Sequence, residues 1–225
     1  MIEIVARYLG DLRERVVFLG GAVTFLLLSD PAAPDVRPTR DVDVIVEATK
    51  RSDYYQLEEN LRSLGFTPVP EEDAPICRWR IGEVLVDIMP TDEKILGFSN
   101  PWYPAALENS VNFPISDDLT IRLITAPHFL ATKIEAFLGR GKKDFRGSPD
   151  MEDIIAILDG RIEIVEEIEA SNHELKKYLA AQFKALLENK LFLEAVPGHL
   201  RPDAASQKRL GGLIEKIRTI ATRFE

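Results

Sequence analysis

The stretch RDVDVIV, residues 40–46, constrains the fold of this chain more than any other feature. It is a short apolar run that contains two aspartates two positions apart, and a β-strand places such residues on the same face. Asp41 and Asp43 are therefore expected to point the same way from a buried strand. Two carboxylates held side by side repel each other, and a divalent cation removes this repulsion. The pattern predicts a strand that presents a ligand or metal site.

Asp87 supplies a third carboxylate from another apolar segment. Because side chains alternate along a strand, Leu85, Asp87 and Met89 share one face. With Asp41 and Asp43, this residue would complete a set of oxygen ligands for Mg²⁺ or Mn²⁺, which would hold a triphosphate and activate an attacking hydroxyl. The alternative is three solvated carboxylates at strand ends.

Gly20 and Gly21 lie between two apolar segments, residues 16–19 and 22–28. This order predicts a buried strand, a glycine turn and a helix. Glycine lets the backbone approach a ligand closely, and the first turn of a helix offers free N–H groups to a phosphate. A glycine turn alone also occurs without any ligand. Beside the strand with two aspartates, however, the turn predicts a phosphate cradle next to a metal site.

The periodicity of the chain changes near Pro127. Before it, segments of strand and helix period alternate; after it, nearly everything has helical spacing. The expected fold is of the α/β (α+β) class, with a mixed β-sheet domain of residues 1–125 and a C-terminal helical domain of residues 126–225. Strands are expected at 16–19, 41–47, 76–80, 83–89, 111–115 and 119–125. Helices are expected at 2–14, 20–28 and 52–64, from Pro127, from Ser148, and near 161–170, 172–189 and 203–223.

Lys133 interrupts the apolar face of an expected helix in the second half. A lysine in this position must be paired or extend to solvent. Lys133 would reach a triphosphate across a cleft between the domains, or it would form an ion pair with Asp150 or Asp153. Asp150 is accordingly either a base for the acceptor hydroxyl or the partner of the lysine, and the sequence leaves both alternatives open.

Three further groups of charged residues have two interpretations each. The glycine-rich basic loop 139–147 includes Lys143 and Asp144 and lacks the spacing of a phosphate-binding P-loop. It is either a mobile loop that touches NTP or RNA, or a solvated surface loop. Arg40 would bind a phosphate or form a structural ion pair. Trp79, between two arginines, is expected in the core rather than stacked on a base.

Composition excludes several classes of protein. The chain has 225 residues, a formal net charge of −9 and one cysteine, Cys77, so neither an internal disulfide nor a cysteine zinc site is expected. Its three histidines are isolated, which disfavours zinc chemistry. We expect a cytoplasmic protein without a signal peptide or a membrane span. An acidic chain binds nucleic acid only through a local basic patch, so the charge counts mildly against a large polyanionic partner.

Together these motifs resemble the nucleotidyltransferase superfamily of the DNA polymerase β type, and within it the AbiEii toxin-like nucleotidyltransferases. The resemblance covers roughly residues 16–158 and is carried by residues 19–21, 37–44, 86–88, 131–136 and 150–154. Gly21 stands where the family often has serine. Pro149 stands where toxin-like relatives often have lysine, and Lys143 and Asp144 lie earlier. These departures leave open which lysine and which acid act in the helical half.

The resemblance implies Mg²⁺-dependent transfer of NMP from NTP to an acceptor hydroxyl, with release of pyrophosphate. It further implies an RNA acceptor, such as the 3′ end of a tRNA, and an antitoxin protein as partner. The alternatives are nucleotidylation of a small molecule or a protein, and a catalytically silent NTP-binding module. The expected site consists of Asp41, Asp43 and Asp87 as metal ligands, Gly20, Gly21, Arg40 and Lys133 as phosphate-binding groups, and Asp150 as a further catalytic residue.

Overall fold

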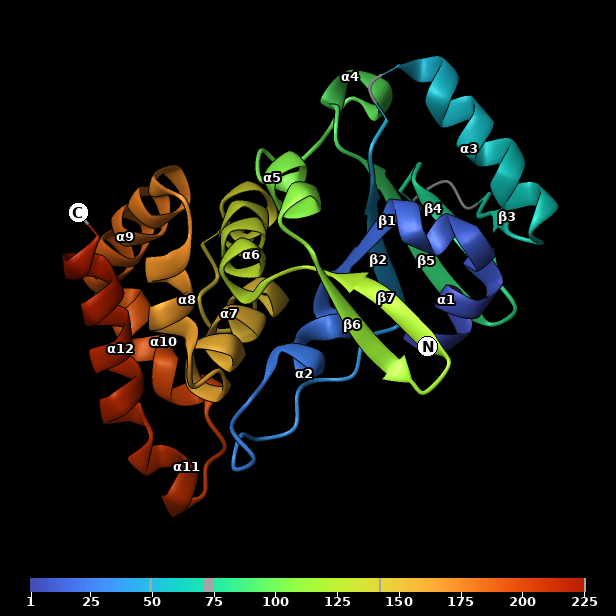
Figure 1. Cartoon of the computed structure of the whole chain (residues 1–225). Coiled ribbons are helices and arrows are strands. Elements are labelled where there is room, and N and C mark those ends of the chain that lie inside the picture. The colour runs from blue at the N-terminus through green and yellow to red at the C-terminus, as the bar shows by residue number, and fades with distance from the viewer. Residues whose placement is uncertain (49, 71–74, 142, 225) are drawn as a thin grey trace. The chain divides into compact units, whose positions relative to one another are not determined.

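A computed structural model describes residues 1–48, 50–70, 75–141 and 143–224. The chain forms two compact units of different architecture (Figure 1). The first comprises Met1–Val23 and Arg37–Thr125, and the second comprises Thr24–Val36 and Ala126–Glu225. The α/β class predicted from the sequence is confirmed, because the described residues form both a mixed sheet and many helices. The segment Thr24–Val36 belongs to the helical unit, whereas the sequence analysis counted it with the sheet.

In the described part of the chain, seven strands form one sheet in the order β3-β4-β5-β2-β1-β7-β6 (Figure 1). The central strand β2 is antiparallel to β1 and parallel to β5, and β1 is parallel to β7. The remaining pairs are antiparallel. The strands are β1 (Val16–Leu19), β2 (Asp41–Val46), β3 (Thr67–Pro68), β4 (Arg78–Ile81), β5 (Val84–Pro90), β6 (Val111–Ser116) and β7 (Leu119–Leu123).

One face of the central strands is wholly apolar and is covered by helix α3 (Arg51–Ser63). The helix is tied to this face at two points: the Tyr54 hydroxyl donates to the carbonyl of Ile88 at 3.3 Å, and the Arg62 guanidinium lies 5.3 Å from the centre of the Trp79 ring. Trp79 is 2% exposed, so it belongs to the core as expected. Because side chains alternate, the aspartates of β2 and β5 lie on the opposite face. Buried residues of the apolar face include Phe18, Val42, Val44, Trp79, Val86 and Ile88.

The other helices of the first unit are shorter than the sequence pattern suggests. The helix expected over residues 2–14 divides at Gly10, whose φ of +52° is unfavourable for a continuing α-helix. Helix α3, in contrast, has the length expected for 52–64 but begins one residue earlier, so that Lys50 rather than Ser52 precedes it. The remaining helical elements are α1 (Ile2–Leu9), the 3₁₀ helices η1 (Gly10–Arg15) and η2 (Gly21–Val23), α4 (Glu93–Leu96) and α5 (Tyr103–Glu108).

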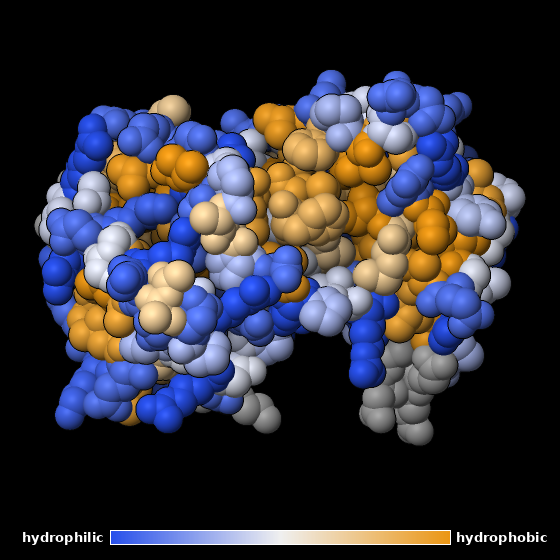
Figure 2. Space-filling model, turned by 90° about the horizontal axis from the view of Figure 1, so that it is seen from below, coloured by the Kyte–Doolittle hydropathy of each residue, from blue (hydrophilic) through white to orange (hydrophobic). Residues whose placement is uncertain are grey.

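Hydrophobic side chains also reach the surface of the molecule. Helix α1 buries Val5 and Leu9 and exposes Ile4 and Tyr8. Figure 2 shows hydrophobic residues among hydrophilic ones on one face of the molecule. Within the described residues, every helix is too short or too polar to cross a lipid bilayer.

The second unit is helical, and α9 packs against α12 while α6 packs against α7 (Figure 1). Helix α7 begins as predicted, with the Ser148 hydroxyl accepting the backbone N–H of Met151 at 3.4 Å. Helix α10 was not among the helices expected from sequence, and it contains Pro197 near its end. The helices are α2 (Thr24–Leu27), α6 (Ala126–Arg140), α7 (Pro149–Gly160), α8 (Ile164–Ala170), α9 (His173–Leu187), α10 (Lys190–His199), α11 (Ala204–Lys208) and α12 (Leu210–Arg223).

Polar contacts attach the segment Thr24–Val36 to the helical unit. The carbonyl of Gly160 accepts the backbone N–H groups of both Ser29 and Asp30 at 3.0 Å. The Arg209 guanidinium donates to the carboxylates of Asp30, at 2.7 Å, and Asp159, at 2.8 Å. Arg209 therefore links this early segment of the chain to the end of α7 by charge-assisted hydrogen bonds.

His128 on α6 gives the helical unit a pH-dependent stability. It is 4% exposed, and burial lowers its pKa from 6.5 to about 4. Its contribution is therefore fully present above pH 6.5 and is lost as the pH falls toward the folded-state pKa, because the unfolded chain gains a proton first. By pH 5, about 1.5 pH units below the ordinary pKa, the expected loss is about 2 kcal/mol.

We expect His128→Gln, which cannot titrate, to reduce the loss of stability between pH 7.5 and pH 5 relative to the native chain. Urea unfolding at both pH values measures this difference. An equal loss in both proteins would show that other groups carry the pH dependence.

Candidate active site

Strands β2 and β5 bring the three predicted aspartates onto one face of the sheet. In their parallel register Asp43 lies opposite Asp87, and Asp41 lies opposite Leu85. The three carboxylates therefore project from neighbouring positions on the face that α3 does not cover. Asp87 is 8% exposed and is therefore buried, whereas the Asp41 side chain is 32% exposed and accessible to solvent.

Gly20 lies directly against one of these carboxylates. It follows β1, in which Leu19 is paired with Asp43 of β2, and has a φ of +75°. A Cβ atom at this position would lie 2.6 Å from Cγ and 2.8 Å from Cβ of Asp43, which no real side chain permits. The glycine is thus required by the close approach of the Asp43 carboxylate and by the left-handed backbone conformation.

Arg78 of β4 binds two of the three aspartates. Its Nε and Nη2 atoms donate to the two carboxylate oxygens of Asp87, each at 2.7 Å, and Nη2 also donates to Asp41 at 2.9 Å. The antiparallel register places Arg78 opposite Asp87, so the two parallel hydrogen bonds from the guanidinium to this carboxylate join residues that face each other on neighbouring strands. The hydrogen bond to Asp87, more than any other interaction, raises the pKa of Arg78. The guanidinium therefore stays charged and offsets the repulsion between Asp41 and Asp87.

The residue types at this face suit a hard divalent cation, but the arrangement of their side chains does not. Three carboxylates offer the oxygen ligands that Mg²⁺ and Mn²⁺ prefer. As placed, however, the oxygens of Asp41 and Asp87 bind Arg78. Throughout the described residues, no three His, Cys, Asp or Glu side chains are positioned to hold a metal ion together. Arg78 thus engages carboxylate oxygens of Asp41 and Asp87 that a divalent cation at this face would also use.

The contact of Arg78 with the aspartates was not predicted from the sequence, although the hairpin pattern contained a signal for it. A turn at Ile81 and Gly82 would pair Arg78 with Leu85. In the structure the turn consists of Gly82 and Glu83, and the partner of Arg78 is consequently Asp87. Placing Gly82, whose φ is +55°, at the first turn position would have given the correct register.

In the helical unit, Lys133 and Asp150 form a buried ion-pair network. Lys133 Nζ lies 2.6 Å from Asp153 and 3.4 Å from Asp150, and the three residues are between 2% and 7% exposed. Arg140 adds two hydrogen bonds to Asp150, both at 3.0 Å. The ion pair of Lys133, which the sequence left as one of two alternatives, is therefore present. A role of Lys133 or Asp150 in catalysis stays a prediction.

Burial raises the pKa of Asp150, but the hydrogen bonds from Arg140 and the charge of Lys133 outweigh it, and the net shift is downward. Asp150 is therefore held as a carboxylate with strong donors around it, which makes it a weak base in this arrangement.

The other predicted groups have simpler surroundings. Gly21 begins the 3₁₀ helix η2, and Arg40 is exposed directly before β2. The helix expected from Gly20 to Leu28 is reduced to η2 and the four residues of α2, so it has little dipole to offer a phosphate. In the loop 139–147, Asp144 accepts the backbone N–H of Gly147 at 2.9 Å. Lys142 of this loop lies outside the described residues.

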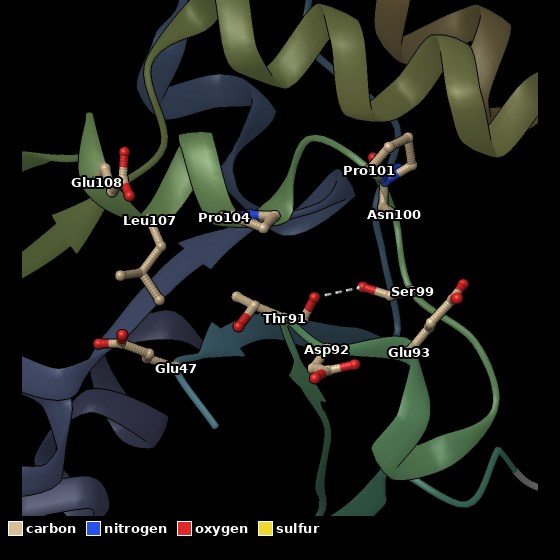
Figure 3. A pocket seen from close by; sticks show the side chains of 10 residues that line it. All are labelled: Glu47, Thr91, Asp92, Glu93, Ser99, Asn100, Pro101, Pro104, Leu107 and Glu108. Carbon is tan, nitrogen blue, oxygen red and sulfur yellow. Dashed lines mark hydrogen bonds between the residues drawn. The ribbon is translucent and has the colours of Figure 1, made fainter. Parts of the chain in front are cut away.

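A pocket of about 520 Å³ lies where β2 and β5 end, at the opposite end of β2 from Asp41. Figure 3 shows the side chains that line it. It is formed by residues that directly follow β2 and β5, by the start of α4, and by α5 with the loop that leads to it. Its described lining contains no lysine, arginine or histidine, so it would repel a triphosphate. Its carboxylates are those of Glu47, Asp92, Glu93 and Glu108.

No family model matches the chain, and no curated protein matches it significantly. Two solved structures from Helicobacter pylori are similar to it. JHP933 is 11% identical over 99% of this chain and 90% of that chain, with a TM-score of 0.48. A proposed nucleotidyltransferase is 12% identical over 99% of this chain and 92% of that chain, with a TM-score of 0.49. Identities this low do not transfer an activity to this chain.

Proposed function

We propose that this chain is a nucleotidyltransferase that moves NMP from NTP to an acceptor hydroxyl. The observation that supports this most is the position of Asp41, Asp43 and Asp87 on one face of neighbouring strands. An otherwise structural protein gains nothing from three adjacent carboxylates, whereas transfer of a phosphoryl group needs oxygen ligands for the cations that accompany a nucleotide. Gly20 keeps the Asp43 carboxylate close to the end of β1, where backbone N–H groups are proposed to meet the phosphates.

The proposal includes Mg²⁺ or Mn²⁺ at Asp41, Asp43 and Asp87 after Arg78 has released two of them. When bound, such an ion would neutralise negative charge on the phosphates. The chain's own residues would hold the carboxylates in register, through the pairing of β2 with β5, and would fix the glycine turn beside them. Arg40, Lys133 and Asp150 are proposed as further phosphate-binding or catalytic residues on the basis of the sequence resemblance.

The proposed acceptor is the hydroxyl of an RNA, such as the 3′ end of a tRNA, and an antitoxin protein is the proposed partner in the manner of toxin-like relatives. A net charge of −9 requires that any RNA be held by a local basic surface. Binding through phosphates would weaken steeply with salt, whereas nucleotidylation of a small molecule or a protein would not show this dependence.

Incubation of the protein with labelled NTPs, Mg²⁺ and bulk tRNA tests the proposal. We expect label in the RNA and a loss of about 100-fold in rate for Asp41→Asn, which keeps the shape of the side chain and removes its charge. Asp117→Asn, in the exposed turn between β6 and β7, is the matched control and should retain the native rate. Label transfer that survives Asp41→Asn unchanged would reject this site.

One observation favours a second candidate function. Arg78 binds two of the three carboxylates, and a guanidinium that never leaves would make the chain a catalytically silent NTP-binding module. Nucleotide binding without incorporation into RNA, protein or small-molecule acceptors would favour this alternative.

A further inference from the structure

Arg78 is held at the aspartates by the geometry of the sheet. The register of β4 and β5 places it opposite Asp87, and the guanidinium fills the space between Asp87 and Asp41 with three hydrogen bonds of 2.7–2.9 Å. Its side chain is 21% exposed. A planar guanidinium suits this position, because its fixed donors match the two oxygens of one carboxylate and leave a donor for the next.

Arg78 balances only one of the two carboxylates that it contacts. Asp41 and Asp87 supply two negative charges and Arg78 supplies one positive charge, so these three side chains together carry a net charge of −1 if each is ionised. Such a group attracts a divalent cation. These carboxylates, however, bind a metal ion less strongly while they hold the guanidinium, because its hydrogen bonds occupy part of their lone pairs and its positive charge repels the cation.

We infer that Arg78 and a divalent cation compete for Asp41 and Asp87, so that Arg78 serves as a built-in counterion that must be displaced before a metal ion binds. This inference rests on the proposed carboxylate site and concerns cation binding alone. A cation that binds only the displaced state has its apparent affinity lowered by the free energy of the contacts that Arg78 gives up. Removal of the guanidinium should consequently tighten metal binding rather than weaken it.

Binding of Mn²⁺ without any nucleotide tests the inference, by calorimetry and by the electron paramagnetic resonance signal of the free ion. We expect Arg78→Gln to bind Mn²⁺ about ten-fold more tightly than the native chain, because a charge-assisted fork is lost from the competing state. Arg51→Gln removes one positive charge from an exposed position at the start of α3, and we expect it to leave the affinity nearly unchanged. This control separates local competition from a general change of charge.

Arg78→Gln leaves Asp41 and Asp87 without their shared partner, so it should melt at a lower temperature without Mn²⁺ and recover part of the loss when Mn²⁺ is added. If it fails to fold even with the metal, Arg78→Lys decides the question. Lysine keeps the charge and loses the fork, and we expect an affinity for Mn²⁺ between those of the native chain and Arg78→Gln.

Equal affinity for Mn²⁺ in the native chain and in whichever of these variants folds would overturn the inference, as would the absence of measurable binding in both. The outcome is separable from that of the transfer assay. Competition observed without nucleotide transfer would reject the proposed function alone, and transfer observed with equal affinities would reject the competition alone.

Discussion

Lys133→Met is expected to destabilise the protein by about 3–5 kcal/mol, the range for breaking a buried ion pair by removing one partner. Methionine is similar to lysine in length and shape, so the loss arises from charge rather than from a cavity. The variant leaves the carboxylates of Asp150 and Asp153, which are 3% and 2% exposed, without the ammonium that lies between them. Urea unfolding at pH 7 measures the change.

Arg140→Gln is the matched control, because it removes the other positive partner of Asp150. The Arg140 side chain is 73% exposed, so its loss should cost less than about 1 kcal/mol. A loss for Lys133→Met no greater than that for Arg140→Gln would contradict the prediction. Such a result would indicate that water or a rearrangement compensates the buried carboxylates.

The effect of Lys133→Met should also depend on pH. In the native chain the pKa of Asp150 is lowered, so its contribution to stability is present above the ordinary value of 3.8 and is lost only as the pH falls through the lower folded-state value. Without Lys133, burial would be opposed only by Arg140, so the pKa of this carboxyl would rise relative to its value in the native chain. Protonation would then relieve the variant earlier as the pH falls, and its difference from the native chain should become smaller as the pH is lowered from 7.

Gly20→Ala is expected to have the second-largest effect on stability, about 3 kcal/mol. Part of this loss, about 1–2 kcal/mol, comes from placing a side chain at a φ of +75°. The rest comes from overlap with Asp43, whose Cγ would lie 2.6 Å from the new Cβ, and overpacking of this kind costs about 1–3 kcal/mol. Because the obstacle is the carboxylate itself, the same change should displace Asp43 and abolish any activity that depends on it.

Gly82→Ala separates the two contributions. Gly82 also has a positive φ, of +55°, but a Cβ there would meet no atom within 4 Å. We expect a cost of about 1–2 kcal/mol, which reflects the backbone conformation alone. Unfolding free energies of the two variants, measured side by side, give the contribution of the contact with Asp43. Equal losses would mean that Asp43 moves away freely and that Gly20 is not required to position it.

The strands that carry the aspartates could be predicted from sequence because the signal is local. Asp41 and Asp43 interrupt an apolar segment with the period of a strand, and the structure has β2 at Asp41–Val46. The environment of the aspartates could not be predicted in the same way. The contact of Arg78 with Asp87 depends on the register of a hairpin, and its contact with Asp41 depends on which strand lies next to β5. Neither is a property of a short segment.

The helical half shows the same limit. The apolar period on α6 predicted that Lys133 faces inward. Its candidate partners, Asp150 and Asp153, lie on the next helix of the chain, which can pack against α6. The addition of Arg140 to Asp150 was not foreseen, since it lies outside the apolar stripe. The assignment of Thr24–Val36 to this unit depends on contacts such as that of Asp30 with Arg209, which lie 179 positions apart in the sequence.

The assignment of Thr24–Val36 to the helical unit means that the polypeptide passes from one unit to the other three times, after Val23, Val36 and Thr125. Neither unit is a continuous stretch of the gene product. A truncation that starts at Ala126 would leave Arg209 without Asp30 and the Gly160 carbonyl without its two donors. A fragment of the helical unit intended for separate expression, or for exchange between homologues, should therefore contain residues 24–36 as well as residues 126–225.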